Sequence, residues 1–151
     1  MADKIKAIEK ISKGLFDQVD LKVDLKVGKQ DGDVFAIQIE TDQSGILIGY
    51  HGQTLSALQL LIGMMLFKQS NEWVRVLVNV GDYREKRKEM LENMAKASSQ
   101  KVKATGQIHR LPPMPSIERR IIHLFLADDS QVETTSEGEG RDRHIVIKLK
   151  S

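Results

Sequence analysis

The sequence predicts an α+β protein composed of two small modules. Residues 21–27, 35–39 and 74–80 alternate apolar and polar side chains, as strands with one buried face do. Residues 3–18 and the segment after Gln53 instead repeat apolar residues at spacings of three and four, as helices do. A second series of helices and strands follows the third strand, and 151 residues are enough for two small modules.

The first module opens with a helix over residues 3–18, where apolar residues recur with lysines between them. Two strands follow, over residues 21–27 and 35–39. The polar segment 28–33 between them contains two glycines, so we expect the two strands to form an antiparallel hairpin.

Two further helices and a strand complete this module. Asp42 and Ser44 are expected to cap a short helix that ends near Ile48. A longer helix begins at Gln53 and carries apolar residues along one side. Valines at every second position then predict a strand over residues 74–80.

The second module begins with a long helix. Asp82 is expected to cap its start, with Glu85 completing a capping box, and Gly106 is suited to its end. A short strand is expected within residues 107–111. Three prolines then make a stiff connection to the next helix.

A helix over residues 116–126 and strands over 132–137 and 144–149 complete the second module. At about 100° per residue, one broad apolar arc of this helix is expected to be buried. The arc contains Ile117, Ile121, Ile122, Leu124, Phe125 and Leu126. Glu118 lies in the same arc, so we expect it to form an ion pair with a neighbouring arginine or with the lysine-rich long helix.

Composition excludes several classes of protein. The formal net charge is only +2, which argues against a strongly basic, non-specific nucleic-acid coat protein, although the basic excess lies in the second half. The chain has no cysteine, so disulfides and thiolate metal sites are excluded. The most apolar run, residues 55–67, is too short to span a membrane, and no secretory signal opens the chain. We expect a cytoplasmic protein with no membrane span.

A Gly-x-x-Gly loop formed by Gly49, Tyr50, His51 and Gly52 is the first candidate site. Two glycines let the backbone turn sharply and approach a ligand closely. The free N–H groups of the helix that follows form an anion site, which a phosphate could occupy. A lone Gly-x-x-Gly is most often a turn. Its position after two strands and between two helices favours a binding loop here.

The second candidate site lies on the polar arc of the second module's shorter helix, where Arg119, Arg120 and His123 fall together. Arg119 and His123 are four residues apart, so they are neighbours on the helix. A guanidinium and an imidazole can jointly bind a phosphate or a ribose. His109 and Arg110 are candidates to extend this basic face. The alternative is that these charges are merely solvated, which is the commoner situation.

The order of elements around the Gly-x-x-Gly resembles the type II KH domain, which is α-β-β-α-α-β with a three-stranded sheet and helices on one face. In KH domains this loop clamps the backbone of about four nucleotides of single-stranded nucleic acid. The resemblance covers residues 3–80, and it implies a KH domain over residues 1–81.

Arg119 and His123 also match the motif that names the R-3-H domain, a small module associated with single-stranded nucleic acids. Residues 111–114, 118–123, 132–134, 136–139 and 145–147 resemble that domain too. This implies an R-3-H domain over residues 82–151, with helices on a small, mainly antiparallel sheet. A KH domain followed by an R-3-H domain resembles the Jag family of bacteria, also called SpoIIIJ-associated proteins.

The family resemblance implies a non-catalytic protein that binds single-stranded RNA, or single-stranded DNA. It also implies a regulatory role in cell elongation, division or envelope synthesis, with a small partner KH protein or self-association. Family members often carry an additional N-terminal domain and linker. No such segment precedes the first helix, so we expect a short relative or a trimmed chain.

The loop departs from the family pattern, which usually places Lys or Arg between the two glycines. Tyr50 and His51 remove that permanent charge from the phosphate clamp. Tyr50 could stack on a base, as aromatic platforms do, or pack locally. The departure leaves an alternative function open, a protein-interaction adaptor whose KH loop has lost most of its RNA affinity.

No enzyme motif stands out. The sequence has no Ser–His–Asp or Cys–His arrangement, no Walker sequence and no HExxH motif. We therefore expect no catalytic residue, no cofactor, no metal site and no small-molecule substrate. Trp73, the chain's single tryptophan, is expected to pack in the core or at the sheet edge rather than to be exposed for stacking.

Overall fold

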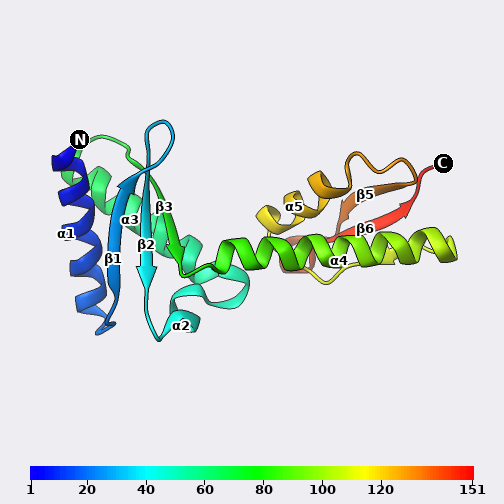
Figure 1. The fold of residues 1–151 in the computed structure, drawn as a ribbon, viewed down its shortest axis with the longest axis horizontal. Coiled ribbons are helices and arrows are strands. Elements are labelled where there is room, and N and C mark those ends of the chain that lie inside the picture. The colour runs from blue at the N-terminus through cyan, green and yellow to red at the C-terminus, as the bar shows by residue number, and fades with distance from the viewer. The chain divides into compact units, whose positions relative to one another are not determined.

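The computed structural model describes residues Met1–Ser151 and confirms the predicted α+β fold. It contains five α-helices and two three-stranded sheets (Figure 1). The chain divides into two compact units, Met1–Arg84 and Glu85–Ser151, which we call unit 1 and unit 2. No helix combines the length and the apolar character that crossing a membrane requires.

Unit 1 has the predicted order of elements. They are α1 (Ala2–Gln18), β1 (Asp24–Lys29), β2 (Val34–Glu40), α2 (Ser44–Ile48), α3 (Gln53–Ser70) and β3 (Arg75–Val80). β2 lies in the centre of the sheet, antiparallel to β1 and parallel to β3. The predicted hairpin is therefore confirmed. Because β2 and β3 are parallel, α2, the Gly-x-x-Gly loop and α3 form the crossover connection between them.

The first strand begins three residues later than the alternation predicted. The Leu21 N–H donates to the Phe16 carbonyl at the end of α1 (3.0 Å), and pairing with β2 begins only at Asp24, opposite Glu40. Leu21 and Val23 still pack against the core. The alternation therefore correctly predicted which side chains pack against the core. The strand itself starts later, because β2 ends at Glu40, which pairs with Asp24.

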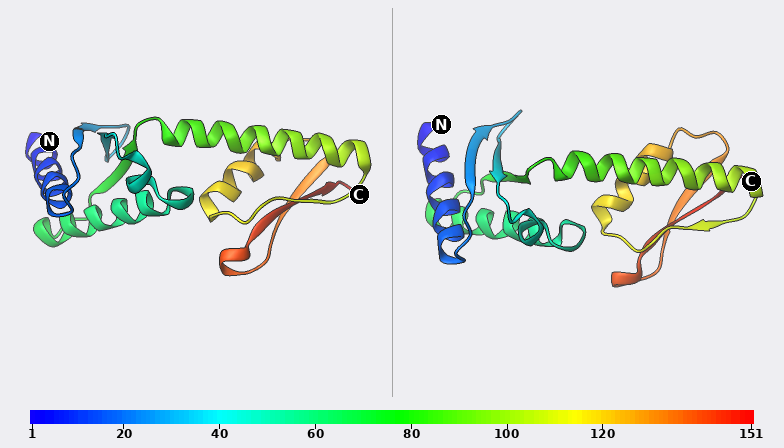
Figure 2. Two further views of the ribbon diagram at one scale, coloured as in Figure 1. Left: turned by 90° about the horizontal axis from the view of Figure 1, so that it is seen from below. Right: turned by 60° about the horizontal axis from the view of Figure 1, so that its bottom comes forward.

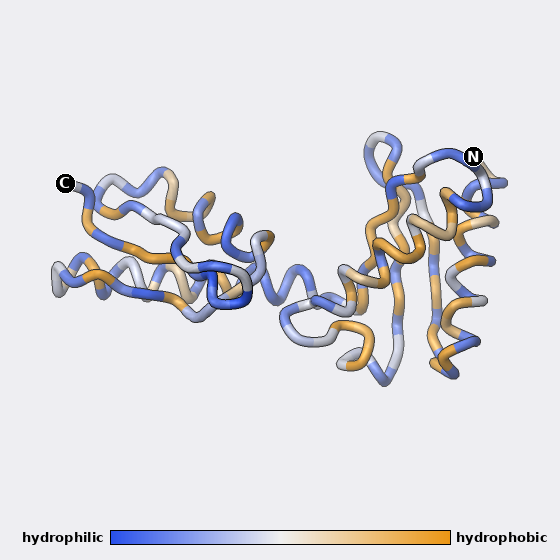
Figure 3. Tube along the Cα trace, turned by 180° about the vertical axis from the view of Figure 1, so that it is seen from behind, coloured by the Kyte–Doolittle hydropathy of each residue, from blue (hydrophilic) through white to orange (hydrophobic).

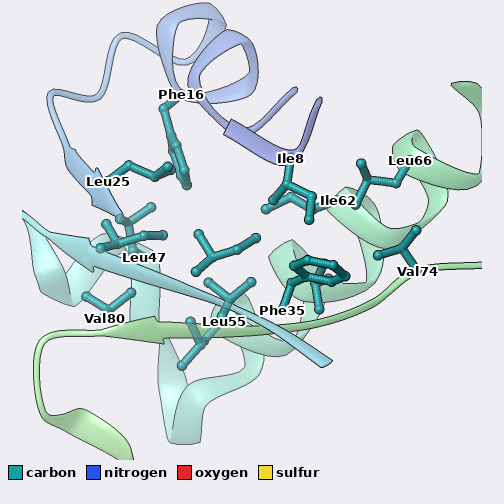
Figure 4. Packing of buried hydrophobic residues seen from close by; sticks show 14 residues of the cluster. Ile8, Phe16, Leu25, Phe35, Leu47, Leu55, Ile62, Leu66, Val74 and Val80 are labelled. Atoms are coloured by element: carbon teal, nitrogen blue, oxygen red, sulfur yellow. The ribbon is translucent and has the colours of Figure 1, made fainter. Parts of the chain in front are cut away.

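The core of unit 1 lies between one face of the sheet and the two long helices, α1 and α3, as the views in Figures 1 and 2 show. Ile8 and Phe16 of α1 and Ile62 of α3 are at most 1% exposed. In Figure 4 these side chains converge with those of the strands. Full burial of each such side chain stabilises the fold by about 1.5–3 kcal/mol. This shared core fixes α3, and therefore the loop at its start, on the sheet.

The cap predicted for the short helix α2 is wrong. Its N-cap is Gln43, and no side chain caps the helix start. The Thr41 hydroxyl instead accepts a hydrogen bond from the Gln43 N–H (3.2 Å). A local turn led by Thr41 therefore takes the chain from β2 into α2, while Asp42 is exposed.

Unit 2 contains most of the long helix and the second sheet. The elements are α4 (Tyr83–Thr105), β4 (His109–Arg110), α5 (Ser116–Leu126), β5 (Val132–Glu137) and β6 (His144–Leu149). β6 is central and antiparallel to both neighbours, so the predicted antiparallel sheet is confirmed. Gly106 ends α4 with a φ of 69°, and its N–H donates to the Val102 carbonyl (2.8 Å). The predicted C-terminal glycine of this helix is confirmed.

The buried face of α5 is narrower than the apolar arc predicted. Ile122 and Leu126 are buried, but Ile117 and Leu124 are each 60% exposed and Phe125 is 43% exposed. The helix packs on β5 and β6 with one face, so residues on the far side of the arc reach solvent. An apolar residue on a helix predicts burial only where a second element covers it.

Glu118 forms the predicted ion pair, and its partner is Arg87 of α4. Arg87 Nε donates to one carboxylate oxygen at 2.7 Å and Nη2 to the other at 2.9 Å. Glu118 is only 5% exposed. This bidentate pair joins the first third of α4 to the start of α5, the helix that carries the second candidate site.

Asp129 organises the turn between α5 and β5. Its carboxylate accepts hydrogen bonds from Lys103 Nζ (2.6 Å) and from the N–H groups of Gln131 (2.9 Å) and Val132 (3.3 Å). The hydrogen bond from Lys103, followed by that from the Gln131 N–H, lowers the pKa of Asp129 from its ordinary value. The ionised carboxylate therefore stabilises unit 2.

We expect Asp129→Asn to lower the free energy of unfolding by about 1–3 kcal/mol at neutral pH, because charge-assisted hydrogen bonds are lost. The folded-state pKa is below the unfolded value of about 3.9, so this contribution is complete above that value and disappears as pH falls through the folded-state pKa. The Tm difference between parent and variant, followed by circular dichroism, should be constant above about pH 5 and shrink below about pH 4. Glu133→Gln, which breaks a surface pair with Lys148, is the matched control and should cost under about 1 kcal/mol. An Asp129 effect that persists unchanged in acid would contradict this account.

Candidate nucleic-acid interface

Both glycines of the loop in unit 1 are required by its geometry. Gly49 and Gly52 have φ angles of 69° and 74°, in the left-handed region. A Cβ at Gly49 would collide with the Thr54 hydroxyl, and one at Gly52 would lie 3.2 Å from the Tyr83 ring. The loop is therefore held tightly between the start of α3 and a tyrosine at the start of α4.

The two residues between the glycines lie at the tip of this loop. Tyr50 is 74% exposed, and His51 has a φ of 51°. Their ring centroids are 4.1 Å apart. No side chain caps α3, which begins at Gln53 directly after the loop. The Gln53 N–H donates to the Tyr50 carbonyl, so the anion site consists of the N–H groups that follow it in the first turn. The loop combines backbone donors, an imidazole and an exposed aromatic ring.

A groove of about 560 Å³ lies between α3 and β3 in unit 1. Its walls combine apolar residues with a few polar side chains. They are Gln30, Val34, Ser56, Gln59, Leu60, Gly63, Trp73, Val74, Arg75, Val76 and Leu77. Ser56 is one helical turn beyond the loop, so the groove starts close to the candidate phosphate site.

The β3 side of this groove is the free edge of the sheet. Gln59 Oε1 accepts a hydrogen bond from the Val78 N–H (3.1 Å), and Arg84 Nε donates to the Val78 carbonyl (3.1 Å). These bonds cover the outward-facing backbone groups at Val78. Strand residues alternate in direction, so the N–H and C=O of Val76 also face the groove. A strand edge of this kind can hydrogen-bond to an extended ligand.

In unit 2 the two residues of the Arg119/His123 motif stand over β5. Arg119 Nη1 donates to the Ser136 hydroxyl (2.5 Å) and Nε to the Met114 carbonyl (3.2 Å). His123 Nδ1 lies 2.6 Å from the Thr134 hydroxyl. Four residues along a helix and two residues along a strand span nearly the same distance. Arg119 and His123 can therefore each contact one strand hydroxyl, and the two side chains are held next to each other.

Arg143 belongs to this cluster, although it was not among the predicted site residues. Its Nε donates to the Ser136 hydroxyl at 2.9 Å, so one hydroxyl accepts from both Arg143 and Arg119. Two guanidinium groups thus meet beside His123, and Arg143 is exposed. In the sequence, the one sign of this proximity is that Arg143 directly precedes the last predicted strand. In a hairpin the start of β6 lies beside the end of β5, where Ser136 is.

Arg120, His109 and Arg110, the other residues predicted for the second site, do not all lie on the same surface as Arg119 and His123. Arg120 is exposed on α5. His109 pairs with Ile147, whose partner on the other side is Thr134, so all three point to one face of the sheet. Arg110 is the next residue along β4 and points to the opposite face. The sheet face beneath α5 therefore includes His109 but not Arg110.

Two family comparisons match this division of the chain. Residues 5–78 match the KH domain of KhpA/KhpB, and residues 89–149 match the R-3-H domain. The two matches lie in unit 1 and unit 2, respectively.

Several bacterial proteins are similar to this chain along most of its length. An RNA-binding protein KhpB of Clostridium symbiosum is 42% identical over 146 residues, which is 96% of this chain and 65% of that protein. The protein of the same name from Bacillus subtilis is 40% identical over 114 residues, 74% of this chain and 55% of the relative. The protein of that name from Lactiplantibacillus plantarum is 39% identical over 114 residues, which is 76% of this chain and 35% of that protein. The chain thus spans between about one third and two thirds of these relatives.

Proposed function

The chain belongs to the Jag-like family, in which a KH domain is followed by an R-3-H domain, and on this premise we propose that it binds single-stranded RNA through two sites. The first is the Gly49–Gly52 loop with its groove, within a KH domain over residues 1–81. The second is the Arg119/His123 cluster, within an R-3-H domain over residues 82–151. The relatives named RNA-binding proteins support this proposal.

The observation that carries the proposal is the positioning of Arg119 and His123 on β5. Hydrogen bonds to Ser136 and Thr134 hold both side chains in place before any ligand arrives. Preorganised donors lose little conformational entropy on binding, so their charge-assisted bonds to phosphate contribute more affinity. The proposed function has no chemical step, and we propose neither a catalytic residue nor a cofactor.

Two modest sites on one chain gain avidity when one RNA strand reaches both. From the family resemblance we also propose a cytoplasmic, regulatory role in cell elongation, division or envelope synthesis. A small partner KH protein would share that role.

RNA titration at several salt concentrations tests the proposed function. For single strands, log K falls with log salt with a slope of about −0.7 per phosphate contact. We expect about two to four contacts, and therefore a slope between about −1.4 and −2.8, with a fluorescently labelled mixed-sequence RNA and the full chain. Absence of binding at low salt, or binding that does not respond to salt, would contradict the proposal.

A protein-interaction adaptor is the second candidate function, and the outer surface of α3 favours it. This helix carries one charged residue, Lys68, and Figure 3 shows its largely hydrophobic character. Leu60, Met64 and Phe67 are 44–57% exposed along it. Exposed apolar patches of this kind mark interaction surfaces. The adaptor alone would give no salt-dependent RNA binding, so the same titration separates the two functions.

A further inference from the structure

Trp73 is exposed, contrary to the packing predicted for it. Its side chain is 58% exposed, although it is the chain's only tryptophan and lies just before β3. A Cβ built at Gly63 of α3 would lie 3.6 Å from the indole, so the ring rests against the helix where that residue has no side chain. The Phe67 ring supports it from a centroid distance of 6.1 Å. The indole is therefore held by α3 and presents the rest of its surface to solvent.

The ring also lines the groove of unit 1, at the end far from the Gly-x-x-Gly loop. Gly52 and Gly63 are eleven positions apart, which corresponds to about 16 Å along the helix. Ser56 and Gln59 line the groove between these two points. The groove therefore runs from Ser56, one helical turn beyond the loop, along the free edge of β3 to Trp73.

The chemistry of the groove fits a nucleobase better than an apolar protein side chain. A base has a flat π-face and a hydrogen-bonding edge. The groove offers the indole for the first, and Gln59, Arg75 and the outward backbone groups of Val76 for the second. The indole's other side lines a separate cleft of about 640 Å³ whose walls are almost wholly apolar, with only Lys68 and Gln69 polar. The polar groups on the groove side favour RNA as the occupant.

We propose that Trp73 is a stacking platform for one unpaired RNA base at the end of the groove opposite the Gly-x-x-Gly loop. The proposal rests on the proposed RNA binding and adds a specific contact to it. Stacking tolerates any base because every base has a π-face. Trp73 thus supplies affinity without sequence preference. This affinity compensates for the phosphate binding that the Tyr50–His51 loop loses because it has no permanent positive charge.

Because the chain has one tryptophan, its tryptophan emission reports on the surroundings of Trp73. We expect unlabelled mixed-sequence single-stranded RNA to quench the emission of the full chain, with the same midpoint as binding measured by anisotropy of labelled RNA. Trp73→Leu should weaken binding about tenfold, while Trp73→Phe, which keeps an aromatic face, should weaken it about threefold or less. Met64→Ala is the matched control. Met64 is exposed and lines only the apolar cleft, so this variant should bind RNA with the affinity of the parent. Circular dichroism checks that every variant is folded.

The outcomes separate this inference from the proposed function. If the parent binds RNA but its emission does not change and Trp73→Leu binds equally well, Trp73 is not a platform and RNA binding stands. If the parent does not bind labelled RNA at all, both proposals fail. An emission change on dilution of the protein without RNA, together with unaltered RNA affinity of Trp73→Leu, would assign Trp73 to a protein contact and overturn the inference.

Discussion

Alanine at both Arg119 and His123 is expected to weaken RNA binding by about 1–3 kcal/mol, roughly 5- to 150-fold. These side chains are the best-positioned charged or polar donors of the two proposed sites, since each is held on β5 by a hydroxyl. Arg119 also donates to the Met114 carbonyl, so some loss of stability accompanies the loss of affinity. Affinity is measured by anisotropy of labelled single-stranded RNA at a temperature where circular dichroism shows a folded chain.

Lys96→Ala is the matched control for this pair, because it removes one formal charge from an exposed position of α4. It should change the affinity less than about twofold, since an isolated exposed charge contributes little. Equal losses in the control and in the double variant would mean that net charge, and not the positioned cluster, sets the affinity.

His51→Asp provides the comparison at the loop of unit 1. Asp is among the non-glycine residues that tolerate the left-handed backbone found at His51, so the loop should keep its conformation. The carboxylate would repel a phosphate at the start of α3. We expect a smaller loss than at Arg119 and His123, because the loop has no permanent positive charge. If His51→Asp abolishes binding while the alanine pair binds like the parent, this ranking of the two sites is wrong.

Removal of Arg87 is expected to have the largest effect on stability. Glu118 is 5% exposed and receives two short hydrogen bonds from the Arg87 guanidinium. Deleting one partner of a buried ion pair costs about 3–5 kcal/mol, because the remaining charge stays in a poorly solvated position. Arg87→Ala should therefore unfold unit 2 at a much lower urea concentration. Arg87→Met combined with Glu118→Leu replaces the pair with apolar groups and should recover most of the loss.

The position of the single tryptophan allows one urea titration to follow the unfolding of unit 1 separately from that of the whole chain. Trp73 lies in unit 1, whereas far-ultraviolet circular dichroism reports on both units. The expected result for Arg87→Ala is an early transition by circular dichroism and an unchanged tryptophan transition. If the double replacement is as unstable as Arg87→Ala, the cost comes from packing at these positions and not from the buried charge.

The sequence predicted the elements well where the local pattern and the packing agree. In unit 2, α5, β5 and β6 have the predicted bounds. Pro115 directly precedes α5, and the glycine-containing loop Gly138–Gly140 separates β5 from β6. The first strand was placed three residues early, since alternation records which side chains are buried and not which backbone groups find a partner. Asp42 was expected to cap α2, but Thr41 one residue earlier forms the turn.

The site was predictable only as far as neighbours along one helix or one loop. Arg119 and His123 were identified because four residues make one helical turn. Arg143 was missed, since its proximity to Arg119 depends on the register between β5 and β6. Trp73 was expected to pack because tryptophan usually does, but it is 58% exposed, and the part that packs rests against Gly63 of α3. The roles of these residues in RNA binding remain predictions.

The parallel pairing of β2 and β3 has a consequence for how the loop forms during folding. Val34 pairs with Arg75, 41 positions later, and in unit 2 His109 pairs with Ile147, 38 positions later. Closing a segment of that length costs about 3 kcal/mol of chain entropy before any pairing compensates it. Contacts of such high sequence separation slow folding. The Gly-x-x-Gly loop of unit 1 lies inside the segment between β2 and β3, so it should reach its final shape only when these two parallel strands have met.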